Sequence, residues 1–160
     1  MEIELCGYNV LIDTDDYEKV KNFRWFINRK SERLYGKVYF EYKHSGVTGI
    51  FRTSLHRLIM GLKTHDGKVV DHINGNTLDN RRQNLRICTI AENNMNARGG
   101  KRKYNLPKGA YKMKLSARYM SQITLNKTIY YLGYYDTPEE AHAAYCEASK
   151  KYHGEFGRTD

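Results

Sequence analysis

The chain has 160 residues, with 27 Lys and Arg against 18 Asp and Glu, which gives a formal charge of +9. This length suits one ordinary domain or two small ones. No run of about 18 apolar residues occurs, so the sequence excludes a membrane-spanning helix. The aromatic content of 12% is too high for a disordered chain. Three separated cysteines without a Cys-x-x-Cys pair argue against both a cysteine zinc site and a disulfide framework.

The basic excess favours a polyanionic partner, and nucleic acid is the leading candidate. The first residues, Met1 to Leu5, are acidic and short in apolar length, which is not typical of a signal peptide. We therefore expect a cytoplasmic protein that is not secreted. We expect no membrane partner and no small-molecule cofactor.

Residues 1–60 mix short strands with short helices. Residues 38–42 and 48–53 look like two paired strands around the segment that begins at His44. A capped helix is expected to start at Thr14, and a second short helix is expected over residues 55–61. The segment is too rich in Tyr, Phe and Ile to be a tail. It is either a structural extension of the part that follows or a further DNA-contacting unit.

The most informative stretch runs from Val69 to residue 96. Its order is a short apolar strand, an Asn-Gly-Asn turn at residues 74–76, a second strand at residues 84–88, and a helix opened by the capping box Thr89-x-x-Glu92. The sequence therefore predicts a ββα unit between residues 69 and 96.

Four polar residues are spaced along this unit. Asp71 and Asn93 offer a carboxylate and a carboxamide oxygen, which suit Mg²⁺ because this ion takes one or two protein oxygens and keeps several waters. A neutral His72 beside the ion can deprotonate a water that attacks phosphorus. Asn84 has donor and acceptor groups with which it can tie the loop backbone. The pattern indicates metal-assisted phosphodiester hydrolysis.

At these positions the sequence resembles the HNH (ββα-metal) endonucleases, and most of all the phage-type homing endonucleases with the order His–Asn–Asn. Asp71-His72 is followed by Asn84 twelve residues later and by Asn93 nine further on, within Asp-His-x-x-Gly-Asn and Asn-Leu-Arg. The resemblance implies that His72 is the general base, that Asp71 and Asn93 are metal ligands, and that Asn84 supports the loop. It implies Mg²⁺ as the ion, with Mn²⁺ as a substitute, and a bacterial host or phage-infected cell.

Further basic residues are candidates for contacts with DNA phosphates. Arg57, Arg82 and Arg86 flank the site, and the alternative for each is a solvated face. Residues 99–107 form a predicted basic linker, which contains Lys101, Arg102 and Lys103. His56 is expected to be a hydrogen-bonded structural residue rather than a second catalytic group. No role is expected for His142 and His153.

Residues 108–160 predict a strand meander followed by one helix. Strands are expected at residues 109–113, 118–125 and 128–134, with Asn126-Lys127 as a two-residue hairpin turn. Thr137-Pro-Glu-Glu140 predicts the start of a helix, with Thr137 as N-cap, Pro at the first position and Glu140 closing the capping box. A sheet with one face under this helix leaves a polar and aromatic outer face, which can enter a major groove.

This part resembles the APETALA2/ethylene-response-factor DNA-binding domain. The resemblance is carried by residues 108–111, 122–124, 130–137, 139–145 and 154–156, including Leu-Gly-x-Tyr-Asp-Thr-x-Glu-Glu-Ala. Ser116-Ala117 stands where the plant members have Trp-Gly, so their base preference does not carry over. The residues that the resemblance implies in DNA contact are Lys108, Tyr111, Arg118, Gln122, Thr124 and Tyr131.

Together these patterns predict an α+β chain. A ββα-metal nuclease domain with a β-rich N-terminal extension (residues 1–98) is followed by the linker (99–107) and by a three-stranded antiparallel sheet on one helix (108–160). The expected function is metal-dependent cleavage of double-stranded DNA by a monomer or weak dimer. The alternatives are a catalytically inactive DNA-binding regulator on the same scaffold and, less well supported, an RNA-binding basic protein.

Overall fold

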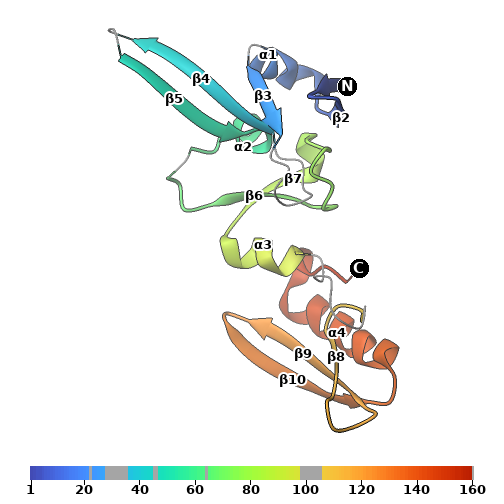
Figure 1. Cartoon of the computed structure of the whole chain (residues 1–160). Helices are drawn as coiled ribbons and strands as arrows, with labels where there is room; N and C mark the ends of the chain where they lie inside the picture. Colours follow the sequence, from blue (N-terminus) through green and yellow to red (C-terminus); the bar gives the residue numbers. More distant parts are fainter. Residues whose placement is uncertain (22, 28–35, 45–46, 64, 98–105, 160) are drawn as a thin grey trace. The chain divides into compact units, whose positions relative to one another are not determined.

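The computed structural model describes residues 1–21, 23–27, 36–44, 47–63, 65–97 and 106–159, and it is a mixed α/β structure with small antiparallel sheets (Figure 1). The chain divides into two compact units, Met1–Ile90 and Ala91–Asp160. Each unit has a hydrophobic cluster of its own.

The first unit begins with a hairpin of β1 (Glu2–Leu5) and β2 (Tyr8–Leu11). Its two-residue turn, Cys6-Gly7, has positive φ angles of 55° and 80°, which match the right-handed twist of the paired strands. A 3-10 turn, η1 (Thr14–Asp16), leads into the short helix α1 (Tyr17–Val20). The helix expected from Thr14 thus starts as a tighter turn before it becomes α-helical.

A three-stranded antiparallel sheet follows, with the order β3-β4-β5. Its strands are β3 (Arg24–Ile27), β4 (Gly36–His44) and β5 (Val47–Ser54). The pairing predicted for residues 38–42 and 48–53 is confirmed by the register, in which Val38 lies opposite Thr53. Helix α2 (Leu55–Met60) ends at Gly61, whose φ of 68° is the left-handed conformation common at helix ends.

Strands β6 (Val69–His72) and β7 (Leu85–Cys88) form a two-stranded sheet, and the 3-10 turn η3 (Arg82–Asn84) closes the loop between them. Strand β2 lies beside this loop, because the Leu11 amide donates to the Leu78 carbonyl (2.8 Å) and the Leu11 carbonyl accepts from the Asn80 amide (2.7 Å). The N-terminal segment is therefore built into the same unit as the predicted catalytic loop.

The hydrophobic core of the first unit draws on both parts of its sequence. Its buried members are Val10, Ile12, Val20, Trp25, Leu55, Ile59, Val70 and Leu85. Half of these residues precede position 54. Of the two roles open for residues 1–60, the core supports that of a structural extension.

The second unit begins in helix α3 (Ile90–Asn96), whose first residue still belongs to the first unit. A sheet with the order β10-β9-β8 follows, made of β8 (Ala110–Lys112), β9 (Tyr119–Leu125) and β10 (Thr128–Tyr135). The predicted hairpin turn is confirmed, since Asn126 and Lys127 both have positive φ, 49° and 66°. Such a pair of angles defines a type I′ turn.

Helix α4 (Pro138–Tyr152) covers one face of this sheet and is followed by the 3-10 turn η4 (Gly154–Phe156). Its predicted capping box is present, with Thr137 and Glu140 bonding each other's backbone amides. Ile123 and Tyr145 pack together in the core beneath the helix. Gly109 has a φ of 84°, and a Cβ atom at this position would overlap the Tyr145 ring, so the site requires glycine.

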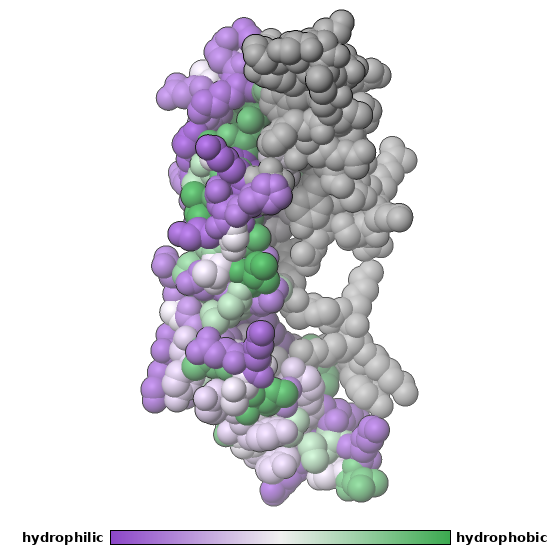
Figure 2. All heavy atoms as spheres, turned by 90° about the vertical axis from the view of Figure 1, so that its left-hand side faces the viewer, coloured by the Kyte–Doolittle hydropathy of each residue, from purple (hydrophilic) through white to green (hydrophobic). Residues whose placement is uncertain are grey.

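The helices of the described residues are short, and none is long and apolar enough to cross a bilayer. On the face drawn in Figure 2, the coloured atoms show hydrophilic and hydrophobic residues interspersed in small groups. This pattern is usual for a surface exposed to water.

Candidate active site

His72 is the last residue of β6, at the start of the loop that leads to β7. Two backbone bonds fix this position. The Ile73 amide donates to the Asn84 carbonyl (2.9 Å), and the Gly75 amide donates to the His72 carbonyl (2.8 Å). His72 and its neighbour Asp71 are each only 6% exposed. The fold therefore buries an imidazole and a carboxylate next to each other at a strand end.

The side chains of Asn80 and His56 contact the His72 ring. The Oδ1 atom of Asn80 lies 3.2 Å from Nε2 of His72. The His56 ring, on α2, packs edge-to-face against it, with centroids 5.1 Å apart and planes at 70°. His56 is itself hydrogen-bonded through Nε2 to the Ser54 hydroxyl (3.0 Å). The structural role expected for His56 is thus accompanied by direct contact with the predicted base.

Burial keeps both imidazoles uncharged near neutral pH. It lowers the pKa of His72, and the opposing effects of the Asn80 bond, Asp71 and Asp79 do not reverse this direction. Burial, together with His72 and Arg57, lowers the pKa of His56 to about 3. A neutral His72 can accept a proton, which is the state that a general base requires.

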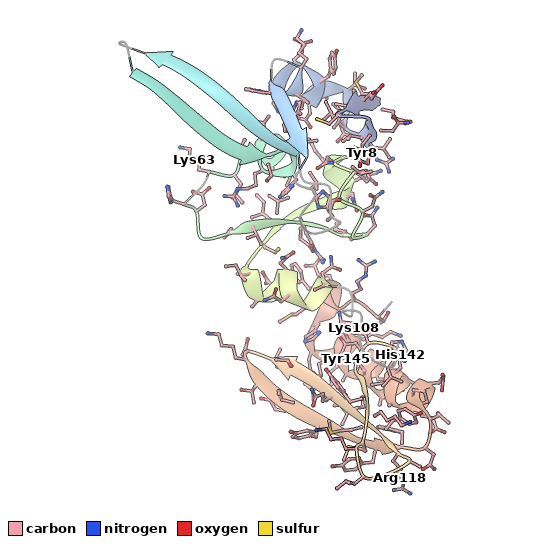
Figure 3. The ribbon with its side chains drawn as sticks, in the orientation of Figure 1. Tyr8, Lys63, Lys108, Arg118, His142 and Tyr145 are labelled. Atoms are coloured by element: carbon pink, nitrogen blue, oxygen red, sulfur yellow. The ribbon has the colours of Figure 1, made fainter. Side chains whose placement is uncertain are left out.

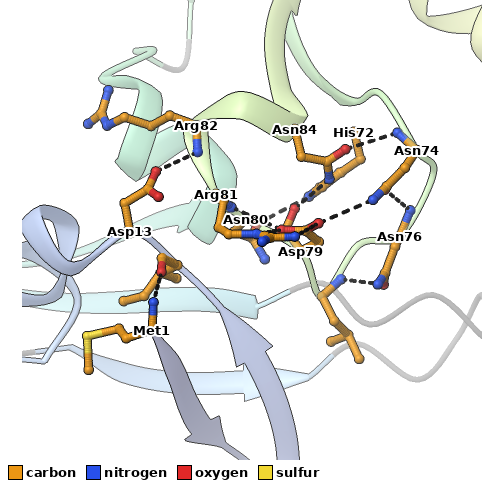
Figure 4. Close-up of polar contacts among 12 residues, drawn as sticks. Met1, Asp13, His72, Asn74, Asn76, Asp79, Asn80, Arg81, Arg82 and Asn84 are labelled. Atoms are coloured by element: carbon orange, nitrogen blue, oxygen red, sulfur yellow. Dashed lines mark hydrogen bonds and ion pairs between the residues drawn. The ribbon is translucent and has the colours of Figure 1, made fainter.

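The loop between β6 and β7 is held by its own asparagines (Figure 4). The Asn84 side chain accepts from the Asn74 amide (3.0 Å) and donates to the Asp79 carbonyl (2.7 Å), so it spans the loop from one side to the other. Asn76 accepts from the Leu78 amide (3.1 Å). The sequence assigned Asn84 this kind of support, and its importance for catalysis stays a prediction.

Asp79 is a second fixed point of the loop. It pairs with the Arg81 guanidinium through both oxygens, at 2.8 Å each, and accepts from the Asn74 side chain at 3.2 Å. The Arg81 hydrogen bond holds the pKa of Asp79 below its usual value. The Asp-x-Arg spacing of Asp79 and Arg81 is the sequence signal for this ion pair, which was not among the predictions.

The Asp71 carboxylate is held by Arg86, which lies opposite it in the β6–β7 register. The Arg86 Nε and Nη2 atoms lie 3.0 Å and 2.9 Å from the Asp71 Oδ2 atom. An arginine that bonds a carboxylate oxygen through two nitrogens fixes its orientation. Asp71 is therefore an oriented oxygen donor one residue from His72.

The Asp71 carboxylate, with Asn93 as the second predicted ligand, suits an ion that needs few protein ligands. Within the described ranges, no cluster of three or more His, Cys, Asp or Glu side chains could hold a metal. A closed zinc-type site therefore does not occur there, whereas Mg²⁺ accepts one or two protein oxygens and fills its shell with water and phosphate oxygens. Asn93, the second predicted ligand, lies on α3 in the other unit, so its convergence with Asp71 stays a prediction.

The comparison with known families bears on this same stretch. Residues 54–95 match the family model of the HNH endonucleases. We call these residues the HNH segment, and they contain Asp71, His72, Asn84 and Asn93. The match supports a nuclease that acts on DNA. No curated protein and no solved structure matches the chain.

The arginines predicted to contact phosphate make contacts within the protein. Arg57 donates to the carbonyls of Lys68 (2.9 Å) and Lys63. Arg82, at the end of the loop in the HNH segment, pairs with Asp16, and Arg86 pairs with Asp71. Their predicted phosphate contacts are untested, but each has a structural partner that the sequence did not reveal.

Outside the HNH segment, the predicted sheet residues share a face. Tyr111 lies opposite Met120, and Gln122 lies opposite Tyr131. Thr124, two residues further along β9, lies opposite Ile129. Because Ile123 between them is buried under α4, this alternate set faces away from the helix. Arg118, directly before β9, is exposed and lies 3.2 Å from Asp136.

Lys108 is placed differently from the other predicted DNA contacts. Its ammonium group donates to the carbonyls of Met95 (2.8 Å) and Ala97 (2.7 Å) at the end of α3. Its own carbonyl bonds Nδ1 of His142 (2.7 Å), and Figure 3 shows Lys108, His142 and Tyr145 close together. Lys108 therefore joins α3 to α4, and His142 has a structural role that the sequence did not suggest.

The predicted DNA contacts Lys101, Arg102 and Lys103 lie outside the described residues.

His153, for which no role was expected, has a structural contact. It is buried and contacts the Thr124 carbonyl through Nε2 (2.9 Å). It therefore ties the end of α4 to strand β9.

Proposed function

We propose that the chain is a divalent-metal-dependent DNA endonuclease of the phage homing type, which hydrolyses a phosphodiester bond. The observation that carries the proposal is the buried, uncharged His72 next to the Asp71 carboxylate within the HNH segment. This pair supplies a proton acceptor and an oxygen ligand at one point of the chain.

In this proposal His72 accepts a proton from the water that attacks phosphorus. Asp71 and Asn93 are the residues that hold the ion, expected to be Mg²⁺ with Mn²⁺ as a substitute. The bound ion supplies Lewis-acid stabilisation of the charge that develops on the phosphate and on the leaving oxygen. Arg86 orients the Asp71 carboxylate, and the Asn84 bonds hold the loop that carries His72 in place.

We further propose that the outer face of the second unit binds the target DNA. It offers Tyr111, Gln122, Thr124 and Tyr131, with Arg118 directly before β9. Lys101, Arg102 and Lys103 are added from the sequence as further basic candidates. Aromatic and amide side chains can contact base edges, while the basic side chains contact phosphates. Binding should therefore weaken as salt concentration rises. A cytoplasmic location in a bacterial or phage-infected cell is part of the same proposal.

One active site per chain makes a monomer a nicking enzyme. Two strands can be cut only by a dimer or by two successive binding events. The product formed at limiting enzyme concentration distinguishes these possibilities.

The test is conversion of supercoiled plasmid by the full chain at low salt with Mg²⁺ or Mn²⁺, with EDTA as the metal-free control. His72→Ala is compared with His65→Ala, because His65 lies on an exposed turn of the same unit. We expect nicked product with metal from the wild type and from His65→Ala. We expect none with EDTA or from His72→Ala.

A chain that binds plasmid and its source genome tightly but cuts neither would contradict the proposal. That outcome would support the inactive DNA-binding regulator on the same scaffold. Equal nicking by His72→Ala and the wild type would contradict the role of His72.

A further inference from the structure

Asn80 is among the most deeply buried polar residues of the first unit, with 2% exposure. Its backbone amide donates to the Leu11 carbonyl on β2 (2.7 Å). Its side-chain Nδ2 donates to the Thr77 carbonyl (3.1 Å). Only the NH₂ end of a carboxamide can donate to a carbonyl, so the Thr77 bond fixes which end of the amide points in which direction.

With Nδ2 on Thr77, the oxygen of Asn80 faces His72. An amide oxygen only accepts hydrogen bonds, so the His72 Nε2 atom 3.2 Å away must carry the proton. In a neutral imidazole the other ring nitrogen is then the basic one. The contact selects the Nε2–H tautomer, in which Nδ1 is the proton acceptor.

We propose that Asn80 is a positioning residue that fixes the Nε2–H tautomer and the ring orientation of His72. The His56 ring packed edge-to-face on His72 limits rotation of the same imidazole. Strand β2 holds the backbone of Asn80, so the N-terminal hairpin takes part in orienting the base. The consequence for catalysis rests on the proposed nuclease function, whereas the tautomer does not.

The direct test measures the tautomer by long-range ¹H–¹⁵N correlation NMR on the full chain labelled with ¹⁵N-histidine. His72→Gln identifies the His72 signals by their disappearance. We expect the wild type to show a protonated Nε2 and an unprotonated Nδ1 at pH 7.5. A wild-type His72 with its proton on Nδ1 would overturn the proposal.

Two variants separate positioning from general support of the fold. Asn80→Asp keeps an oxygen acceptor toward His72, and we expect it to keep the Nε2–H tautomer. Asn80→Leu has a similar volume without the acceptor, and we expect a mixture of tautomers. An unchanged tautomer in a folded Asn80→Leu would refute the role of Asn80. If this variant does not fold, the wild type and Asn80→Asp decide the question.

Cleavage kinetics add the functional readout. For Asn80→Leu we expect kcat to fall roughly 10- to 100-fold with little change in KM, and we expect Asn80→Asp to recover most of the loss. Equal kcat in all three proteins would contradict a role in catalysis. If the chain shows the Nε2–H tautomer but cuts neither plasmid nor its source genome, the nuclease proposal is wrong. The assignment of Asn80 as the residue that fixes the tautomer would still hold.

Discussion

Arg82 and Asp16 lie 66 residues apart in the sequence and form a two-pronged ion pair. Arg82 Nε is 2.8 Å from Asp16 Oδ2, and Nη2 is 2.7 Å from Oδ1. Arg82 also donates to the Ile59 carbonyl (2.8 Å), and its backbone amide donates to Asp13 (2.7 Å). The pair joins the N-terminal segment to the loop that carries the predicted site.

We expect Arg82→Met to destabilise the first unit by about 2–3 kcal/mol, because it leaves the fully buried Asp16 carboxylate without its main partner. Trp25, the single tryptophan of the chain, lies in this core and reports its unfolding by fluorescence in urea. Lys19→Met is the matched control, since Lys19 makes one exposed contact with Asp16 and should cost less. Equal losses would contradict the importance of the two-pronged pair.

The stability of the first unit should fall as the pH decreases below about 6.5. The pKa of His56 is about 3 in the folded chain against 6.5 for a free histidine side chain. The unfolded chain therefore binds a proton that the folded chain cannot hold until about pH 3. The contribution of His56 is complete above pH 6.5 and is lost progressively toward pH 3.

Urea midpoints followed by Trp25 fluorescence at pH 7.5, 6.5, 5.5 and 4.5 test this expectation. His56→Phe removes the group and should make the decline shallower, while the remaining decline includes His72, whose pKa is also lowered. Carboxylates such as Asp16 begin to gain protons in the unfolded chain near pH 4.5, and this contribution is common to both proteins. Identical slopes in the two proteins would show that His56 does not carry the effect.

Lys108→Met should loosen helix α3. The change removes two charge-assisted bonds to the Met95 and Ala97 carbonyls, for which a loss of about 1–3 kcal/mol in the second unit is expected. Hydrogen exchange of a peptide covering residues 90–97 should become faster. Lys114→Met, which changes an exposed lysine of the same unit, should leave that exchange unchanged.

The same pair of variants separates two roles of Lys108. A variant that binds DNA more weakly but keeps the wild-type exchange of α3 would favour a phosphate contact over the helix anchor. Faster exchange with unchanged DNA affinity would favour the anchor.

Tyr131 and Tyr130 allow a matched test of the proposed DNA-binding face. They are neighbours on β10 and both are exposed, but Tyr131 pairs with Gln122 on the outer face, and Tyr130 pairs with the buried Ile123. We expect Tyr131→Ala to weaken duplex binding about tenfold and Tyr130→Ala to change it little. Titration at two salt concentrations measures both effects. Stronger weakening from Tyr130→Ala would move the interface away from the outer face.

Local signals in the sequence predicted much of the fold. The Asn126-Lys127 turn and the Thr137–Glu140 capping box depend on residues within a few positions of each other, so residue type alone identifies them. The candidate pair of Asp71 and His72 was found in the same way, because both lie at one strand end and belong to a recognisable motif.

Most of the features that local patterns do not reveal join distant positions. From sequence alone Arg82 resembles a surface cation, because its partner lies in the distant N-terminal segment. Lys108 does so as well, because its acceptors are backbone carbonyls, which have no sequence signature. Asn80 has no distinguishing signal, because a buried amide and an exposed turn asparagine look alike in a sequence. Burial and partner choice depend on tertiary packing, which a single sequence does not encode in any local pattern.

In the first unit, the stretch that matches a known family and the stretch that builds the hydrophobic core begin at different residues. The stretch shared with the HNH endonucleases begins at residue 54, whereas Val10, Ile12, Val20 and Trp25 lie before it. A fragment cut at the edge of the similarity would expose the apolar sides of α2 and β6 and lose the partner of Arg82. Deletion studies on this chain therefore need to keep residues 1–27, because the smallest piece that can fold is larger than the smallest piece that can be recognised.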